Sequence, residues 1–149
     1  FYYYGDGVTQ SYDLAYEWFE KAANNDDLYA MRNLGDYYLK GRGSVSINYS
    51  TAYSWYIKAA ANDNGVAQNQ VGYMYYKGYG FTKNTAKAYC WFKAGASNGS
   101  STAQGWIDNT SLWSGLSMPV DCSIIDDEIT LYKTVEDKQK CTNLDVLLK

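Results

Sequence analysis

The sequence contains no histidine, and this absence removes more reaction mechanisms than any other feature of the composition. Ser-His and Cys-His nucleophile pairs, histidine general bases and histidine-bound zinc all require the imidazole ring. The three cysteines, Cys90, Cys122 and Cys141, have neither the number nor the close spacing of an all-cysteine zinc site. The sequence therefore predicts no metal and no cofactor, and catalysis would have to rest on carboxylates, lysine or tyrosine.

An excess of charge of one sign is also missing. The 149 residues include 13 basic and 16 acidic side chains, which gives a net charge of -3. This balance argues against sequence-independent binding of nucleic acid. No apolar run approaches the roughly 18 residues that a membrane-spanning helix needs, so we expect no direct insertion of this segment into a membrane.

Aromatic residues are abundant, and they recur with a period. The chain has 17 Tyr, 5 Trp and 4 Phe, which supply much of the apolar surface. Trp18, Trp55 and Trp91 lie 37 and 36 residues apart, and each is followed by an aromatic ring and preceded by alanine three residues earlier. A spacing of this kind indicates a repeat protein.

Each repeat reads as two helices. Ala30, Leu34 and Tyr38 have the i, i+4, i+8 spacing of one helical face, and a glycine follows where a left-handed residue would end the helix. Good N-cap residues stand at equivalent positions, so the second helices are predicted to begin near Ser11, Asn48 and Asn84. The G-x-G pairs upstream, which start at Gly5, Gly41 and Gly78, are interpreted as turns rather than phosphate-binding loops.

The second helix of the middle repeat alternates small residues with large rings. Its predicted stripe contains Ala52, Trp55, Tyr56, Ala59 and Ala60. Close approach at the alanines would let an indole fill the remaining gap between helices. We therefore expect Trp18, Trp55 and Trp91 to fill the repeat cores.

These residues resemble the Sel-one-like repeats, which are relatives of the tetratricopeptide repeats. The family pattern is roughly A-x-x-x-L-G-x-x-Y, then G-x-G-V, then A-x-x-W-Y-x-K-A-A, and Ala30 to Ala60 follows it closely. The resemblance implies an all-α fold, a right-handed superhelical solenoid of helical hairpins with about three repeats. The match weakens after Ala103, where Asp108 replaces the expected glycine.

The repeat pattern divides the chain into two parts. Residues 1–113 would form the repeats and residues 114–149 a C-terminal capping segment with a helix over 124–138. The repeat boundaries are predicted as a partial repeat 1–26, full repeats 27–62 and 63–98, and a degenerate repeat 99–113. Phe1 to Tyr4 look like the last turn of a first helix whose earlier part is missing, which predicts a fragment or a processed product.

The cysteines and the glycosylation sequons favour an extracytoplasmic compartment, either the ER lumen, the secreted space or a periplasm, over the cytosol. A Cys122–Cys141 bridge would need a short helix or a fold-back, because a continuous helix separates the two by about 25 Å. Cys90 occupies a repeat position that implies a partly exposed, incidental thiol. N-x-[ST] sequons occur at Asn48, Asn98 and Asn109.

Enzymatic and sugar-binding functions find little support in the residues. The acidic cluster at Asp121 and Asp126 to Glu128 lies where a helix is predicted to begin, and it is interpreted as complementing the helix dipole. The tyrosine-tryptophan stripe is explained by core packing rather than by a carbohydrate platform. A hydrolytic enzyme and a carbohydrate-binding module therefore rank behind a binding scaffold.

The favoured function is a non-catalytic scaffold or adaptor that binds a partner polypeptide within a larger complex. In tetratricopeptide-like stacks the first helix of each hairpin lines the concave face. First-helix positions outside the packing pattern are the candidate partner-binding residues: Tyr29, Arg32, Asp36, Asn69, Tyr73, Tyr76 and Asn109. The alternative is an architectural segment of a large assembly that makes contact through its convex face and C-terminal cap.

Overall fold

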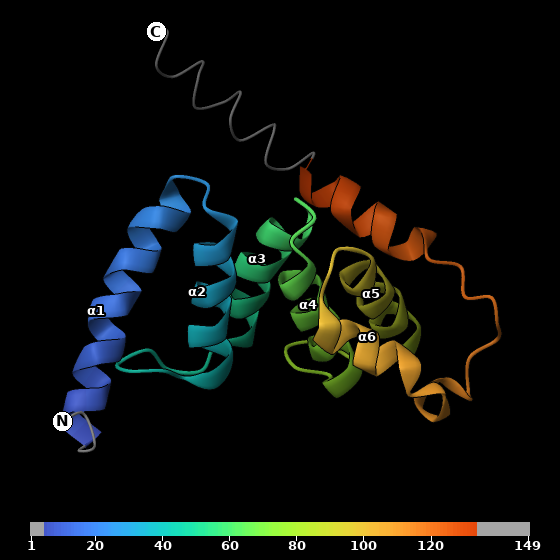
Figure 1. Cartoon of the computed structure of the whole chain (residues 1–149), viewed down its shortest axis with the longest axis horizontal. Coiled ribbons are helices and arrows are strands. Elements are labelled where there is room, and N and C mark those ends of the chain that lie inside the picture. Colours follow the sequence, from blue (N-terminus) through green and yellow to red (C-terminus); the bar gives the residue numbers. More distant parts are fainter. Residues whose placement is uncertain (1–4, 134–149) are drawn as a thin grey trace, which may run out of the picture.

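The protein is a stack of antiparallel helices. A computed structural model describes residues 5–133, which contain helices and connecting loops and no strand. Figure 1 shows the first five helices succeeding one another along the long axis in chain order. They are α1 (Gly5–Asn24), α2 (Leu28–Lys40), α3 (Tyr49–Ala60), α4 (Gly65–Lys77), α5 (Thr85–Ser97), α6 (Ser101–Asp108) and the short 3-10 helix η1 (Thr110–Trp113). The predicted all-α solenoid of helical hairpins is confirmed.

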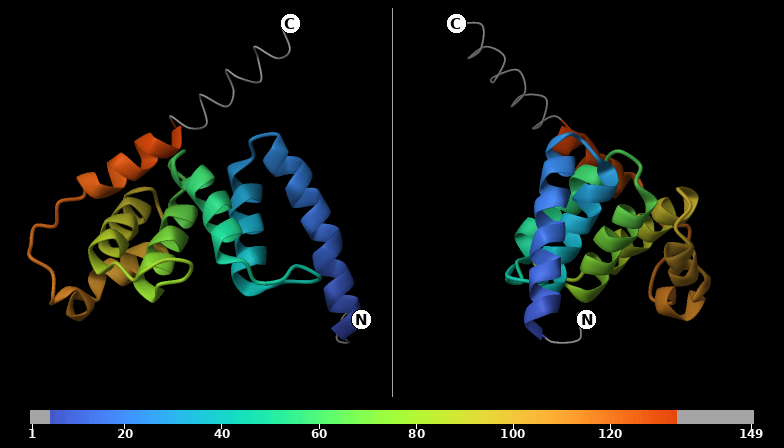
Figure 2. Two further views of the ribbon diagram at one scale, coloured as in Figure 1. Left: turned by 180° about the vertical axis from the view of Figure 1, so that it is seen from behind. Right: turned by 60° about the vertical axis from the view of Figure 1, so that its left-hand side comes forward.

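Helices that are neighbours in sequence are also neighbours in space. α2 packs on α3 and α4 packs on α5, and these two hairpins meet through α3 and α4. α4 also contacts α6, so the first helices of successive hairpins lie on one side of the stack. The two views in Figure 2 show the same succession of hairpins from behind and from the side.

Short polar side chains start the helices at equivalent repeat positions. The side chains of Asp27, Asn64 and Ser100 accept hydrogen bonds from the backbone amides three residues later, at 2.8, 2.9 and 3.1 Å. Asn48 and Asn84 cap α3 and α5 in the same way, at 3.0 Å each. Each cap satisfies an amide that the first turn of a helix leaves unpaired. The predicted starts near Asn48 and Asn84 are therefore confirmed.

The predicted start near Ser11 is wrong, because α1 is already helical at Gly5 and runs through Ser11 without a break. Gly41 and Gly78 do end helices, with φ values of 68° and 73°. There the chain folds back, and the Asn48 amide donates to the Tyr38 carbonyl. Gly5 and Gly7, which are predicted to form a turn, instead lie in the first turns of α1, where a helical glycine costs about 1 kcal/mol relative to alanine.

The core is built from small residues opposite rings. The largest fully buried side chains include Trp91, Tyr37, Tyr56 and Phe92. Two helical glycines let the rings approach the backbone, since a Cβ at Gly72 would lie 3.0 Å from the Phe92 ring, and a Cβ at Gly35 would fall on the Tyr56 ring. In both hairpins a glycine on the first helix thus lies opposite a ring on the second, and this pairing sets how closely the two helices pack.

Gly35→Ala should lower the free energy of unfolding by about 2 kcal/mol. The new methyl group must displace a ring that is fully buried, and overpacking of this kind typically costs about 1–3 kcal/mol. Gly105→Ala in α6 is the matched control, because nothing lies within 4 Å of its Cβ. Urea denaturation of both variants measures the difference, and equal stability of the two would refute the packing argument.

The expectation that all three repeat tryptophans fill the core is wrong for Trp18. Trp91 is fully buried, Trp55 is partly buried, and the Trp18 side chain is 74% exposed. The ring that is fully buried in both the α2–α3 and the α4–α5 hairpin is that of the residue after the tryptophan, Tyr56 or Phe92. The tryptophan position faces outward, so its burial depends on which segment of the chain covers it.

A C-terminal helical segment covers part of that outer face. After η1 the chain passes around α5, and residues 123–133 return as a helix that lies across α4 and α5 toward α3 (Figure 1). The predicted helix over 124–138 is thus present up to residue 133, and its remainder lies outside the described residues. No helix within residues 5–133 has both the length and the apolar character needed to cross a membrane.

Candidate partner-binding site

A pocket of about 270 Å³ lies between the first helices of three successive hairpins. α2, α4 and α6 bring different chemistry to it: aliphatic and basic side chains from α2, amides and a phenol from α4, and a hydroxyl and an indole from α6. The lining residues are Leu39, Lys40, Asn69, Gln70, Tyr73, Thr102 and Trp106. We call this hollow the α2–α4–α6 pocket. Because no single repeat forms it, the pocket exists only in the assembled stack.

Two of the residues predicted for partner binding, Asn69 and Tyr73, line this pocket. Tyr76 adjoins it, with its ring 5.1 Å from that of Trp106. Asn109 lies apart, in a neighbouring hollow of about 230 Å³ that shares Thr102 and Trp106 with the first. The structure thus gathers these positions along one side of the stack.

The predicted positions on α2 form a connected polar row. Tyr29 is 60% exposed, and the Arg32 guanidinium lies 4.8 Å from the centre of its ring. Arg32 also pairs with Asp36 at 3.5 Å. Asp36 itself is buried, so its side chain holds Arg32 in place and does not project from the surface.

A hydrogen-bond network joins this row to α4. The Tyr56 hydroxyl donates to Asp36 Oδ1, and the Gln70 side-chain amide donates to the same oxygen at 3.0 Å. Gln70 in turn accepts from the Asn69 amide nitrogen at 3.2 Å. The network runs from the core of one hairpin to the surface of the next, which fixes the rotamers of the amides in the pocket.

Burial, followed by the negative charge of Asp36, raises the pKa of Tyr56 far above its usual range. The phenol therefore stays protonated and remains a donor to the carboxylate at physiological pH. The pKa of Tyr73 is also raised, first by burial and then by its hydrogen bond with Tyr79. Both phenols therefore keep their protons at physiological pH.

Sequence reasoning missed Gln70 and Trp106 as pocket residues. They occupy one repeat position, three residues after Ala67 and Ala103, where the middle hairpin has Asn33. The recurrence of an amide at Asn33 and Gln70, 37 residues apart, was the available signal. In the last unit an indole replaces the amide, and it stacks on Phe92 with ring centres 4.9 Å apart.

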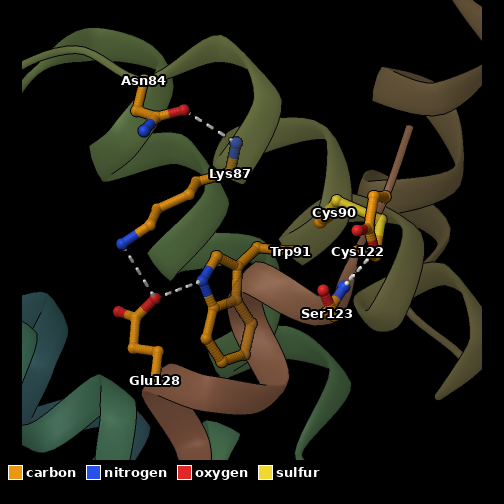
Figure 3. Close-up of a disulfide and its surroundings, with 8 residues drawn as sticks. Asn84, Lys87, Cys90, Trp91, Cys122, Ser123 and Glu128 are labelled. Carbon is orange, nitrogen blue, oxygen red and sulfur yellow. Dashed lines mark hydrogen bonds and ion pairs between the residues drawn. A yellow bond between two sulfur atoms is a disulfide. The ribbon is translucent and has the colours of Figure 1, made fainter. Parts of the chain in front are cut away.

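A second cluster lies outside this pocket, where Glu128 holds residues 123–133 against the repeats (Figure 3). Its carboxylate accepts hydrogen bonds from the Tyr53 hydroxyl, from the Tyr75 hydroxyl at 2.6 Å and from the Trp91 indole at 3.3 Å. Lys87 adds an ion pair at 3.8 Å. Glu128 was expected to complement a helix dipole; instead it joins the helix to α3, α4 and α5.

Cys90 and Cys122 form a disulfide, with their Cα atoms 5.3 Å apart (Figure 3). The prediction of a partly exposed, incidental thiol at Cys90 is wrong, since the residue is fully buried. The bond also rules out pairing of Cys122 with Cys141, which itself lies outside the described residues. The segment after η1 runs back along α5, and this reversal brings together two cysteines 32 residues apart.

The described residues hold no group of three or more side chains of the types that bind metal ions. The carboxylates in the two clusters accept hydrogen bonds from tyrosine, tryptophan and glutamine side chains and form ion pairs with basic ones. What both clusters do chemically is hold helices together and present donors and acceptors in fixed directions.

Comparison with known proteins agrees with this architecture. A Sel1 repeat protein from Oxalobacter formigenes is 30% identical, with a TM-score of 0.62 over 68% of this chain and 41% of the other. A protective antigen from uropathogenic Escherichia coli strains, described as having an SLR fold, is 32% identical, with a TM-score of 0.62 over 72% of this chain and 22% of the other. The chain thus spans less than half the length of either protein. No curated protein sequence gives a match.

The sequence pattern of the Sel1 repeat matches three consecutive segments, residues 1–27, 28–64 and 65–100. These segments cover two thirds of the chain and contain the hairpins α2–α3 and α4–α5. Sel1 repeats generally act as scaffolds for protein–protein interaction. From the repeat pattern, the stacked hairpins and the related structures, we conclude that this chain belongs to the Sel1 repeat family.

Proposed function

We propose that this protein is a non-catalytic scaffold that binds a segment of a partner polypeptide on the face formed by α2, α4 and α6, within a larger complex. One observation carries the proposal: the α2–α4–α6 pocket combines apolar walls with fixed amides, and it spans the first helices of three successive repeats. Tyrosine and tryptophan supply large contact areas at low entropic cost, and they are enriched where proteins bind one another. Tyr73 and Trp106 are such residues.

The alternative, an architectural contact through the outer face, is favoured by a different observation. On α1 the side chains of Leu14 and Trp18 are 57% and 74% exposed. Farther along the stack the same face is already covered, since residues 123–133 lie over Trp91. An architectural role would therefore rest on α1, whereas the scaffold role rests on the α2–α4–α6 pocket.

The disulfide bears on the compartment in which the scaffold works. Disulfides persist in oxidising environments such as the ER lumen, the periplasm and the secreted space, and they are rare in the cytosol. Cys90 and Cys122 are joined. We therefore place the proposed function in an extracytoplasmic compartment. The intact mass of the protein under non-reducing conditions would show whether the bond is present.

Site-specific photocrosslinking tests the proposal against its alternative. A benzoylphenylalanine in place of Tyr73 should form a covalent adduct with a partner protein in cells, and the same probe in place of Trp18 should not. Lys93, which is exposed on α5, provides a third position for background labelling. Adducts from the Trp18 position alone would support the architectural role and overturn the scaffold role.

Tyr73→Ala should weaken binding of the crosslinked partner about tenfold or more, without a change in helical content, because truncating a central aromatic anchor commonly costs about 2 kcal/mol. Tyr73 is partly buried, and its ring lies 6.1 Å from Trp106. Isothermal titration calorimetry measures the affinity, and circular dichroism monitors the fold. Parallel loss of binding and helical signal would instead identify Tyr73 as a residue of the core.

A further inference from the structure

Asn69 carries a buried acceptor with no partner. The residue is 6% exposed, and its Oδ1 atom is the buried side-chain oxygen that lacks a hydrogen bond in the described part of the chain. Buried polar atoms nearly always have partners, because an unsatisfied acceptor costs about 1–3 kcal/mol. Asn69 lines the α2–α4–α6 pocket, so a ligand in this pocket can supply the missing donor.

The surrounding network holds Asn69 in this state. Its amide nitrogen donates to Gln70, and Gln70 is fixed through its own bond to Asp36 at 3.0 Å. Arg32 holds the other oxygen of the Asp36 carboxylate at 3.5 Å. Because each partner is already engaged, none of them can rotate to satisfy Asn69 Oδ1 without breaking a bond elsewhere. The acceptor is therefore oriented before a ligand arrives.

The size and walls of the pocket restrict the ligand. A volume of about 270 Å³ lies below the roughly 300–1,000 Å³ of pockets that enclose a small molecule, and it suits a single inserted side chain. Leu39, Tyr73 and Trp106 supply apolar walls, which favour an aliphatic or aromatic group. An extended polypeptide offers such a side chain together with free main-chain N–H groups, whereas a helix has already used most of its own.

The charges at the pocket are basic. Lys40 lines it, and Lys77 lies 6.0 Å from the ring of Tyr73, on the next turn of α4. Asp36 is buried and paired with Arg32, so it contributes little negative charge at the surface. A locally basic rim on a chain with a net charge of -3 favours an acidic partner segment.

We propose that Asn69 Oδ1 accepts a hydrogen bond from a main-chain N–H of an extended, acidic segment of a partner protein. The segment places one apolar side chain between Tyr73 and Trp106, and a neighbouring carboxylate pairs with Lys40. This inference rests on the proposed scaffold function and specifies its ligand. Asn69 provides the register of the bound segment, because it binds one N–H of the main chain at a fixed point.

A library of random nonapeptides displayed on phage, selected on the complete protein, tests the inference. The enriched sequences should combine an apolar residue with one or more acidic residues nearby. The strongest peptide is then synthesised, and its affinity is measured for the unaltered protein and for Asn69→Leu. We expect a loss of about tenfold with Asn69→Leu, and no loss with Gln104→Leu, a change of an exposed amide on α6 outside the pocket.

N-methylation of the peptide, one main-chain nitrogen at a time, identifies the donor. Methylation at one position should lower the affinity of the peptide for the unaltered protein about tenfold. The same methylated peptide should bind Asn69→Leu as well as the unmethylated peptide does, since both changes remove the same hydrogen bond. Thermal unfolding shows whether Asn69→Leu is folded. We expect its stability to be unchanged or higher, because an apolar group replaces an unsatisfied acceptor.

The outcomes separate this inference from the proposed function. If Tyr73→Ala no longer binds the peptide but Asn69→Leu and Lys40→Glu bind it normally, the inference is wrong and the scaffold function stands. If Tyr73→Ala also binds normally, both are wrong. The inference is also overturned if no sequence enriches on the unaltered protein above the level that it reaches on Tyr73→Ala.

Discussion

Cys122→Ser is expected to lower the free energy of unfolding by about 3–4 kcal/mol. The disulfide closes a loop between residues 32 apart, and in the chain-entropy treatment a crosslink of this span restricts the unfolded chain by about that amount. The bond ties α5 to the start of the 123–133 helix, so the loss should fall most heavily on that helix. Urea denaturation gives the stability, and hydrogen exchange gives the protection of residues 123–133.

Cys141→Ser is the matched control for this experiment. Both sulfur atoms of the bond come from Cys90 and Cys122, so removal of the third cysteine should leave the stability unchanged. Reduction of the unaltered protein should reproduce the effect of Cys122→Ser. A non-reducing peptide map that joins Cys122 to Cys141, or a large loss with Cys141→Ser, would contradict the pairing.

Glu128→Ala should lower the free energy of unfolding by about 3–5 kcal/mol. The change leaves two tyrosine hydroxyls and the Trp91 indole without their acceptor, and removing one member of a largely buried charged network typically costs that much. Glu128→Gln keeps an acceptor and the side-chain volume, so about half of the loss is expected. Asp127→Ala, at an exposed carboxylate on the same helix, should change stability by less than about 0.5 kcal/mol.

The same network gives the stability a characteristic dependence on pH. Burial, and then the hydrogen bond to Glu128, raise the pKa of both Tyr53 and Tyr75 above the usual value of about 10. Above about pH 10 the unfolded chain loses these protons while the folded protein keeps them, so stability falls as the pH rises. Below that pH the two states bind the protons equally, and these tyrosines contribute no pH dependence.

Removal of Glu128 should make the alkaline decline shallower, because one of the causes of the raised pKa values is gone while burial remains. Urea midpoints between pH 8 and pH 11.5 measure this slope for the unaltered protein and for Glu128→Ala. Identical slopes would show that burial alone keeps both phenols protonated up to pH 11.5, and they would contradict the expected contribution of the carboxylate over this range.

The helical hairpins could be predicted from the sequence because their signals are local. Asn48 and Asn84 cap helices with their own side chains, and Gly41 ends a helix through its own backbone conformation. The exposure of Trp18 and the burial of Trp91 could not be predicted in this way, since the two residues occupy the same repeat position. What distinguishes them is coverage by residues 123–133, a contact between distant parts of the chain.

The candidate site was predicted in part for the same reason. The periodic pattern placed Asn69 and Tyr73 on the face of the first helices, and both line the pocket. Gln70 was missed because its role depends on a bond to Asp36 in the preceding hairpin. A contact between repeats leaves no trace in the spacing within one repeat.

By itself, the sequence determined the fold: the absence of histidine restricts the chemistry, and the repeated alanines, glycines and caps specify stacked hairpins through short-range interactions. The tertiary structure alone decided which cysteines pair, how Glu128 holds the C-terminal helical segment, and that Asn69 keeps an acceptor free. These features depend on groups more than 30 residues apart or on adjacent hairpins, and only the packed chain brings such groups within bonding distance.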